Sequence, residues 1–307
     1  MDGVLAEQVD WYEATLPTTE RKRRGHFSTP QLLVERILDA CGYTADADLA
    51  PVRVLDPACG SGNFLAGAVR RLVAFAARSQ LAQQELTALI QRNIWGLDPD
   101  PISCLLAELH LNAIHNQPCP LHIHQADGLT LPWSSQPCVD LFLANPPYLA
   151  AKNTDLSAYH SEQQHGQTDS YLLFLNLGLR IVRPGGWLGL VLPDPLLARA
   201  NAAKQRTDLL KQYTIHHLWH LANIFPAHVG AVVIVAQKQV PDSTHQVTWI
   251  SEKWGQTHEI WEPGQGGHQG DRKGRPYYTP MRQVKPVYSR GDPCGRPGMF
   301  NDLLDTC

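Results

Sequence analysis

The tetrapeptide Asn145-Pro146-Pro147-Tyr148 combines residue types that could hold a small polar group beside an aromatic face. It follows VDLFLA (139–144), an apolar run that predicts a buried strand. Proline cannot donate to a sheet ladder and its ring fixes φ, so the strand must end here in a stiff, extended segment. In an open α/β sheet, ligands bind at the carboxyl ends of the strands. We therefore expect the tetrapeptide to present its side chains at a ligand site.

A glycine-rich turn supplies the second group of candidate residues. In VLDPACGSGNFL (54–65) a short strand ends in Asp56, the chain turns through residues 59–62, and a helix begins. Glycine permits positive φ and close approach of the backbone to a ligand. The spacing differs from the G-x-G-x-x-G fingerprint, and no lysine follows for phosphate. The turn therefore predicts a ligand that carries a nucleoside without a polyphosphate, with a purely structural turn as the alternative.

Two further acidic residues follow predicted strands. Asp98 ends IWGLD (94–98), where a carboxylate can accept hydrogen bonds from both ribose hydroxyls. Asp127 ends LHIHQAD (121–127), where it can accept from an adenine amino group. Each of these acids could instead cap a helix. Their occurrence at successive strand ends favours the binding interpretation.

These residues need a scaffold of alternating strands and helices. Apolar periodicity predicts helices over 30–41, 63–79, 101–114, 169–182 and 196–213, and strands over 52–56, 94–98, 121–127, 139–144, 185–193, 214–221 and 231–238. Strands that alternate with helices imply an α/β fold with a mostly parallel, doubly wound sheet.

Composition narrows the class of protein. The chain has 307 residues, 43% of them apolar and 18% charged, which is enough to form a core. The net charge of −3 carries no overall signature of a nucleic-acid binder, although RKRR (21–24) is a local basic cluster or a solvated arm. Seven scattered cysteines and no apolar N-terminal segment predict a reduced, cytoplasmic protein that does not enter the membrane. Histidine pairs lack partners at metal-site spacing, so we expect no metal.

Taken together, the motifs resemble those of the γ-class N6-adenine DNA methyltransferases, which depend on S-adenosylmethionine. GHFSTP (25–30) resembles the N-terminal cofactor motif, and DPACGSGNF (56–64) matches the glycine-loop motif. NPPY (145–148) matches the catalytic tetrapeptide, and IFPAHVGAVVIV (224–235) resembles a later motif. The resemblance implies a Rossmann-like class I methyltransferase fold whose last strand is antiparallel.

The resemblance also implies a role for individual residues. The residues expected to bind S-adenosylmethionine are Thr29, Asp56, Pro57, Ala58, Gly60, Gly62, Asp98, Asp127 and Asn145. Tyr148 and Phe225 would stack on an adenine flipped out of the DNA duplex. Asn145 and the Pro146 carbonyl offer two acceptors to the two N–H bonds of the target amine. They would concentrate its delocalised lone pair toward the methyl donor, so no covalent intermediate is needed.

The resemblance covers residues 25–240. We expect an N-terminal arm over 1–24 and a Gly/Pro-rich tail over 241–307, weakly ordered or the remnant of a truncated recognition domain. DNA is the expected substrate, and a separate specificity subunit or a missing recognition domain would read the sequence. Two alternatives stay open: an amino-methyltransferase acting on a protein glutamine or a ribosomal RNA base, and a truncated, non-catalytic module that binds the cofactor.

Overall fold

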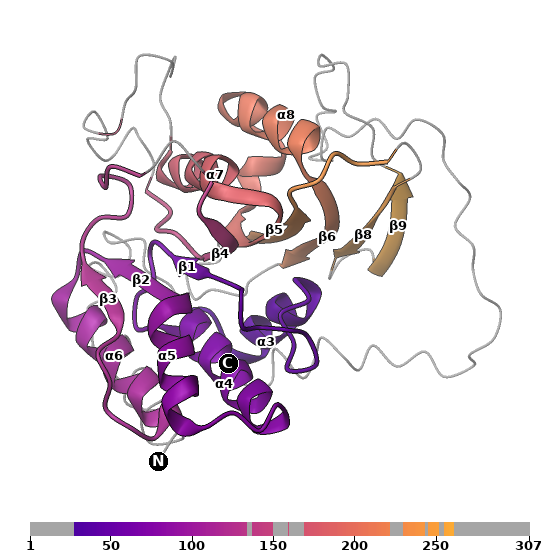
Figure 1. The fold of residues 1–307 in the computed structure, drawn as a ribbon. Coiled ribbons are helices and arrows are strands. Elements are labelled where there is room, and N and C mark those ends of the chain that lie inside the picture. The colour runs from indigo at the N-terminus through magenta and orange to yellow at the C-terminus, as the bar shows by residue number, and fades with distance from the viewer. Residues whose placement is uncertain are drawn as a thin grey trace.

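The computed structural model describes residues 28–133, 137–149, 159, 169–221, 230–242, 245–251 and 255–260. Within these ranges the strands form one nine-stranded sheet in the order β3-β2-β1-β4-β5-β7-β6-β8-β9 (Figure 1). The strands are β1 (Val54–Asp56), β2 (Ile94–Asp98), β3 (His122–Gln125), β4 (Val139–Ala144), β5 (Val182–Pro193), β6 (Thr214–Leu221), β7 (Ala231–Gln237), β8 (Gln246–Ser251) and β9 (Gly255–Ile260).

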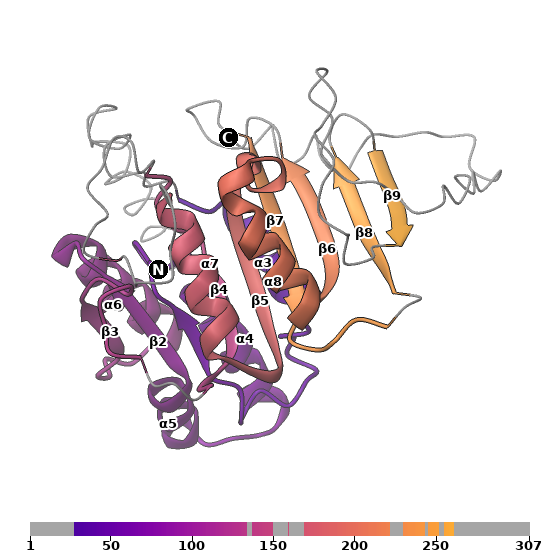
Figure 2. The same ribbon diagram turned by 90° about the horizontal axis from the view of Figure 1, so that it is seen from above.

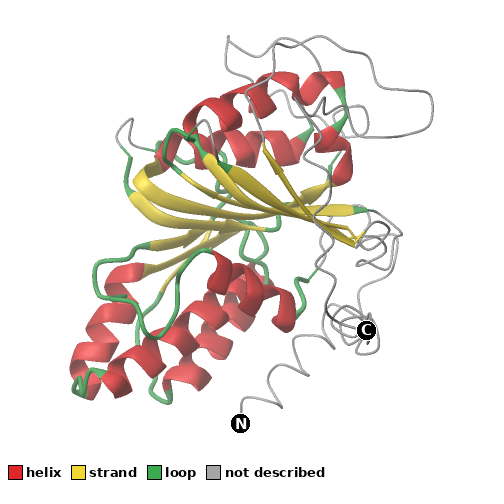
Figure 3. Ribbon diagram, turned by 90° about the vertical axis from the view of Figure 1, so that its right-hand side faces the viewer, coloured by secondary structure: helices red, strands yellow, loops and turns green. Residues whose placement is uncertain are grey.

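Helices cover both faces of the sheet, giving three layers (Figure 3). Helices α3 to α6 lie on one face, and α7 and α8 on the other (Figure 1). Their bounds are α3 (Gln31–Ala40), α4 (Asn63–Arg78), α5 (Gln83–Asn93), α6 (Pro101–His115), α7 (Ser170–Ile181) and α8 (Ala203–Gln212). This arrangement confirms the predicted doubly wound α/β fold.

Strand direction follows the expected pattern. β1, β2, β3, β4 and β5 pair in parallel, whereas β7 is antiparallel to both β5 and β6. β7 is the last strand that the sequence predicted, and its expected antiparallel direction is confirmed, although β8 and β9 follow it in the chain. Strand order reverses between β1 and β4, and in such sheets the crevice beyond the carboxyl ends at this point is where ligands bind.

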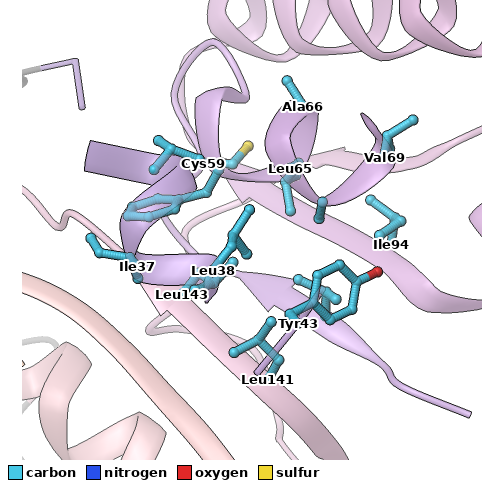
Figure 4. Packing of buried hydrophobic residues seen from close by; sticks show 14 of the residues in the cluster. Ile37, Leu38, Tyr43, Cys59, Leu65, Ala66, Val69, Ile94, Leu141 and Leu143 are labelled. Atoms are coloured by element: carbon cyan, nitrogen blue, oxygen red, sulfur yellow. The ribbon is translucent and has the colours of Figure 1, made fainter. Parts of the chain in front are cut away.

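The central strand β4 shows why an uninterrupted apolar run is required. Leu141 and Leu143 point into the core beneath α3 and α4, while Phe142 and Ala144 point into the core beneath α7. Figure 4 shows Leu141 and Leu143 among the side chains of α3 and α4. All four residues are at most 2% exposed, because a parallel strand covered on both faces alternates between two apolar layers.

Two stretches of the chain differ from the sequence-based expectation. Helix α5 was not expected, because its sequence QQELTALIQRN is largely polar and buries few apolar residues. The single helix expected over 196–213 is replaced by two short 3-10 helices, η2 (Asp194–Leu197) and η3 (Ala200–Ala202), followed by α8. Pro195 lies in the first turn of η2, and Arg199 between the two 3-10 helices is extended.

The sheet continues past residue 240, where the sequence analysis began the tail. β8 pairs parallel with β6, and β9 pairs antiparallel with β8 (Figure 2). Val247 and Trp249 of β8 are buried, an alternation too short to stand out in the sequence. The sheet therefore does not end at residue 240, and the division into arm, domain and tail stays a prediction. Residues 261–307 lie outside the described part of the chain.

Candidate active site

A cavity of about 610 Å³ lies where β1, β2, β3 and β4 end. It is lined by the loops that follow these strands and by the segments that begin α3, α4 and α7. Nine of the predicted residues line it, whereas Gly62, Pro146 and Tyr148 do not: the nine are Thr29, Asp56, Pro57, Ala58, Gly60, Asp98, Asp127, Asn145 and Pro147. Residues that are up to 118 positions apart in the sequence therefore share one site.

The glycine loop after β1 adopts conformations that favour glycine. Gly60 and Gly62 have φ of 53° and 87°, in the left-handed region that other residues rarely enter. A Cβ on Gly62 would lie 2.9 Å from Cβ of Ala107 on α6, so the loop also packs too closely for a side chain. Asp56 is buried and its Oδ1 accepts from Ala58 N at 3.1 Å. These contacts define the shape of the loop.

Asp98 fastens this loop to the end of β2. Its Oδ2 accepts from Gly60 N at 3.0 Å and its Oδ1 accepts from Asp100 N at 2.9 Å. The N-cap of α6 is Asp100, which accepts from Ile102 N at 3.2 Å, so Asp98 does not cap that helix. Each carboxylate oxygen has more than one lone pair, which leaves the predicted contact with ribose hydroxyls chemically available.

Asp127 lies beside a residue that the sequence did not single out. Its Oδ1 accepts from Leu129 N at 2.9 Å, and its Oδ2 accepts from the Tyr159 hydroxyl. The hydrogen bond to the Asp127 carboxylate raises the pKa of Tyr159 to about 12, with burial adding to the shift. Tyr159 also lines the cavity, yet no spacing in the sequence linked it to Asp127.

Gly128 joins the β3 loop to the glycine loop. A Cβ at this position would lie 2.3 Å from the main-chain oxygen of Pro57, well inside van der Waals contact. The Asp-Gly pair after β3 could have indicated this contact from the sequence, because a glycine at a strand end often marks a close approach of two backbones.

The tetrapeptide after β4 is held at both ends. The Asn145 Nδ2 donates to Thr29 Oγ1 at 3.1 Å, and the Tyr148 hydroxyl donates to Asn145 Oδ1 at 3.2 Å. The same hydroxyl lies 3.3 Å from the Val191 carbonyl oxygen of β5, which is a second acceptor for its proton. At the other end, Ser170 Oγ donates to the Pro147 carbonyl and accepts from Leu149 N.

The ring of Tyr148 is half-buried and packs against the core beneath α3 and α4. Burial raises the pKa of its phenol, and the charge of Asp194 acts in the same direction. Its hydroxyl occupies the Asn145 oxygen that the expected mechanism offers to the target amine. Because an amide oxygen has two lone pairs, it can still accept from a target amine beside the Tyr148 hydroxyl.

Cys59 in the glycine loop carries a thiol, which could act as a nucleophile only as the thiolate. Burial raises the pKa of its thiol well above the ordinary value, and the charges of Asp56 and Asp98 add to the shift. A thiolate nucleophile is correspondingly disfavoured at neutral pH.

Several predicted residues lie outside the described part of the chain. These are Phe225 with the rest of 222–229, the basic cluster 21–24 and the first three residues of GHFSTP. Of the three described residues of that motif, Ser28 and Thr29 line the cavity. Among the helices of the described residues, none has the length and apolar character needed to cross a membrane.

Comparison with known proteins identifies the family of this chain. The model of the family described as N-6 DNA Methylase matches residues 7–259. The Type II methyltransferase M.VspI of Vibrio sp. (strain 343) is 24% identical over 245 residues, covering 79% of this chain and 55% of the relative. The Type I restriction enzyme EcoEI methylase subunit of Escherichia coli is 26% identical over 216 residues, covering 67% of this chain and 40% of the relative. The chain thus spans about half the length of the curated relatives it matches.

Solved structures show the same fold. The Type I restriction enzyme EcoKI M protein superposes with a TM-score of 0.59 at 21% identity, covering 74% of this chain and 48% of that one. A Listeria monocytogenes protein described as a class I S-adenosylmethionine-dependent methyltransferase gives a TM-score of 0.53 at 22% identity, covering 74% of this chain and 66% of that one. At this level of identity the likeness concerns the arrangement of the sheet and helices.

Proposed function

The chain belongs to the N-6 DNA Methylase family, and from this premise we propose that it transfers a methyl group from S-adenosylmethionine to the N6 amino group of adenine in DNA. The observation that carries the proposal is the position of Asn145. Its amide lies at the end of β4, in the cavity that the glycine loop and the acids after β2 and β3 also line.

The residues of the cavity fit S-adenosylmethionine. A volume of about 610 Å³ suits a ligand of this size, since small-molecule sites span roughly 300–1,000 Å³. Carboxylate oxygens of Asp98 and Asp127 can accept from the ribose hydroxyls and the adenine amino group respectively. The loop 56–62 brings its backbone close to the ligand, and we assign Thr29, Pro57 and Ala58 to the same site. When bound, the cofactor supplies an electrophilic methyl group.

The chain itself would position the target amine. Asn145 Oδ1 and the Pro146 carbonyl accept from its two N–H bonds, which concentrates the nitrogen lone pair toward the methyl donor. Both acceptors are fixed before the base arrives, so they stabilise the transition state without reorganisation. The adenine must first leave the duplex stack, and the Tyr148 ring supplies one stacking face. Phe225 is proposed, from the resemblance alone, to supply the other.

We further propose that sequence recognition comes from a specificity subunit or from a recognition segment outside the catalytic fold. Relatives of the chain include a methylase subunit of a type I restriction enzyme, and a similar fold occurs in a structure that concerns complex assembly of a type I restriction–modification system. A role in restriction–modification follows as the proposed biological setting.

The proposal is tested by labelled methyl transfer to unmethylated DNA, followed by digestion and separation of the nucleosides. The wild-type protein is compared with Asn145→Ala and with Gln84→Ala, an exposed amide on α5 that serves as the matched control. We expect label in N6-methyladenine, retained in the control and reduced at least about a hundredfold in Asn145→Ala. Label in protein or RNA, or activity that survives in Asn145→Ala, would contradict the proposal.

A further inference from the structure

The side-chain amide of a catalytic asparagine can face two ways. Rotation by 180° about its last bond exchanges the oxygen and the NH₂ group, which have almost the same shape. If the oxygen faces the target amine, it accepts a hydrogen bond. If the NH₂ group faces it, a donor meets a donor and the lone pair is no longer oriented. The orientation is therefore set by a donor at the oxygen, which is the Tyr148 hydroxyl here, and by an acceptor at the NH₂ end.

Thr29 is that acceptor in the structure. Its Oγ1 accepts from Asn145 Nδ2 at 3.1 Å across 116 positions of sequence. Thr29 is 4% exposed, so water has little access to replace it. Asn145 itself is half-buried, and its NH₂ group would lose its protein acceptor if it turned away from Thr29, which gives this contact an influence on the orientation of the amide.

The position of Thr29 is set in turn by Asn63. The Asn63 Nδ2 donates to the Thr29 carbonyl at 3.1 Å and to Ser28 Oγ at 2.7 Å. Asn63 is the first residue of α4, directly after the left-handed Gly62 that closes the glycine loop. A continuous set of hydrogen bonds thus runs from the cofactor loop through Thr29 to the tetrapeptide.

We propose that Thr29 is a positioning residue that holds the Asn145 amide with its oxygen toward the target amine, and that Asn63 acts through Thr29. This role is separate from the contact with the cofactor assigned to Thr29 above. It rests on the proposed function in that Asn145 is taken as the catalytic amide. It also means that the shape of the glycine loop influences the catalytic tetrapeptide.

The first test compares Thr29→Val, which keeps the shape and removes the hydroxyl, with Thr29→Ser, which keeps the hydroxyl. Cofactor affinity is measured by calorimetry and kcat at saturating cofactor and DNA. We expect kcat to fall about threefold to tenfold in Thr29→Val and to be largely restored in Thr29→Ser. A variant in which cofactor affinity alone falls would overturn the proposal.

A second readout does not depend on activity, so failure of the proposed function can be told apart from failure of this inference. Asparagine side-chain amides are isotope-labelled, and the Asn145 signal is identified by its loss in Asn145→Ala. In Thr29→Val we expect this signal to move and its NH₂ protons to exchange faster with water, whereas Thr29→Ser retains the wild-type signal. An unchanged Asn145 signal in Thr29→Val would show that the contact does not orient the amide.

Asn63→Asp tests the more distant step, because a carboxylate has the same shape and cannot donate. We expect the Asn145 signal to move in the same direction as in Thr29→Val, by a smaller amount. Asn116→Asp, an exposed site after α6, controls for the added charge. An Asn63→Asp protein with a wild-type Asn145 signal would remove Asn63 from the proposal and leave Thr29 to the first test.

Discussion

The Asp98 carboxylate accepts a hydrogen bond from the Gly60 amide at 3.0 Å, so the end of β2 holds the loop that follows β1. The second Asp98 oxygen accepts from Asp100 N, which begins the turn into α6. One buried carboxylate therefore joins two loops of the cavity. Its structural task and its proposed contact with the ribose involve the same two oxygen atoms.

Asp98→Asn is expected to weaken both functions. An amide keeps one acceptor and places a donor against one of the two main-chain N–H groups. An unsatisfied buried donor costs about 1–3 kcal/mol, so we expect a loss of unfolding free energy in this range together with weaker cofactor binding. Denaturant unfolding and calorimetry measure the two effects. Asp46→Asn, at a carboxylate that is 82% exposed, should leave both unchanged, since surface ion pairs contribute little.

Gly128→Ala is expected to displace the glycine loop. The new methyl group would lie 2.3 Å from the Pro57 oxygen, a backbone atom that cannot move alone. Overpacking of this kind costs about 1–3 kcal/mol of stability, and here it should also reduce affinity for S-adenosylmethionine. Gly42→Ala is the comparison, because Gly42 has φ of +69° but open space around it. Similar cofactor affinity in the two variants would argue against a link between Gly128 and the loop.

Mutation should separate the contribution of the Tyr148 hydroxyl to methyl transfer from that of its ring. Tyr148→Phe removes the hydroxyl that occupies Asn145 Oδ1 and keeps the ring, so we expect methyl transfer to be retained. Tyr148→Ala removes the ring, and loss of base stacking is worth about 1–3 kcal/mol. Fluorescence of an adenine analogue at the target position measures how well the extruded base is held. Equal defects in the two variants would mean that the hydroxyl, rather than the ring, is what catalysis requires.

His216 is expected to make the fold sensitive to acid. Burial lowers its pKa below the ordinary value of 6.5, and the nearby His245 and His217 add to the shift. Below pH 6.5 the unfolded state then binds more protons than the folded state. The stability that comes from a neutral His216 is thus present above pH 6.5 and is lost as the pH falls toward the lower folded-state pKa. The groups that face His216 include the rings of Trp187 and His245, together with the Gln237 side chain.

His216→Gln should therefore flatten the pH dependence of stability on the acid side of pH 6.5. Urea midpoints at a series of pH values measure this for the variant and the wild-type protein. The same steep acid loss in both proteins would assign the sensitivity to other groups.

Local sequence patterns specify the strands and turns that carry the site. Val139–Ala144 and Ile94–Asp98 form strands with the bounds that were predicted, because an apolar run ends at proline or at an acid followed by proline. The glycine turn and the order of strands and helices could also be predicted, so that Asp56, Asp98, Asp127 and Asn145 were expected at neighbouring strand ends. Helix α5 and strands β8 and β9 escaped prediction, since their apolar positions are too few to mark a period.

Which side chains meet within that site depends on how the elements pack together. The contacts of Thr29 with Asn145, of Tyr159 with Asp127 and of Gly128 with Pro57 join loops that no spacing relates. Periodicity reports which face of an element is buried, and glycine and proline report where it ends; both act over a few residues. The distance between atoms on two loops depends on how parallel strands are registered and how the helices pack against them. That is a property of the whole core, and it is why the residues that orient Asn145 became visible only in the folded chain.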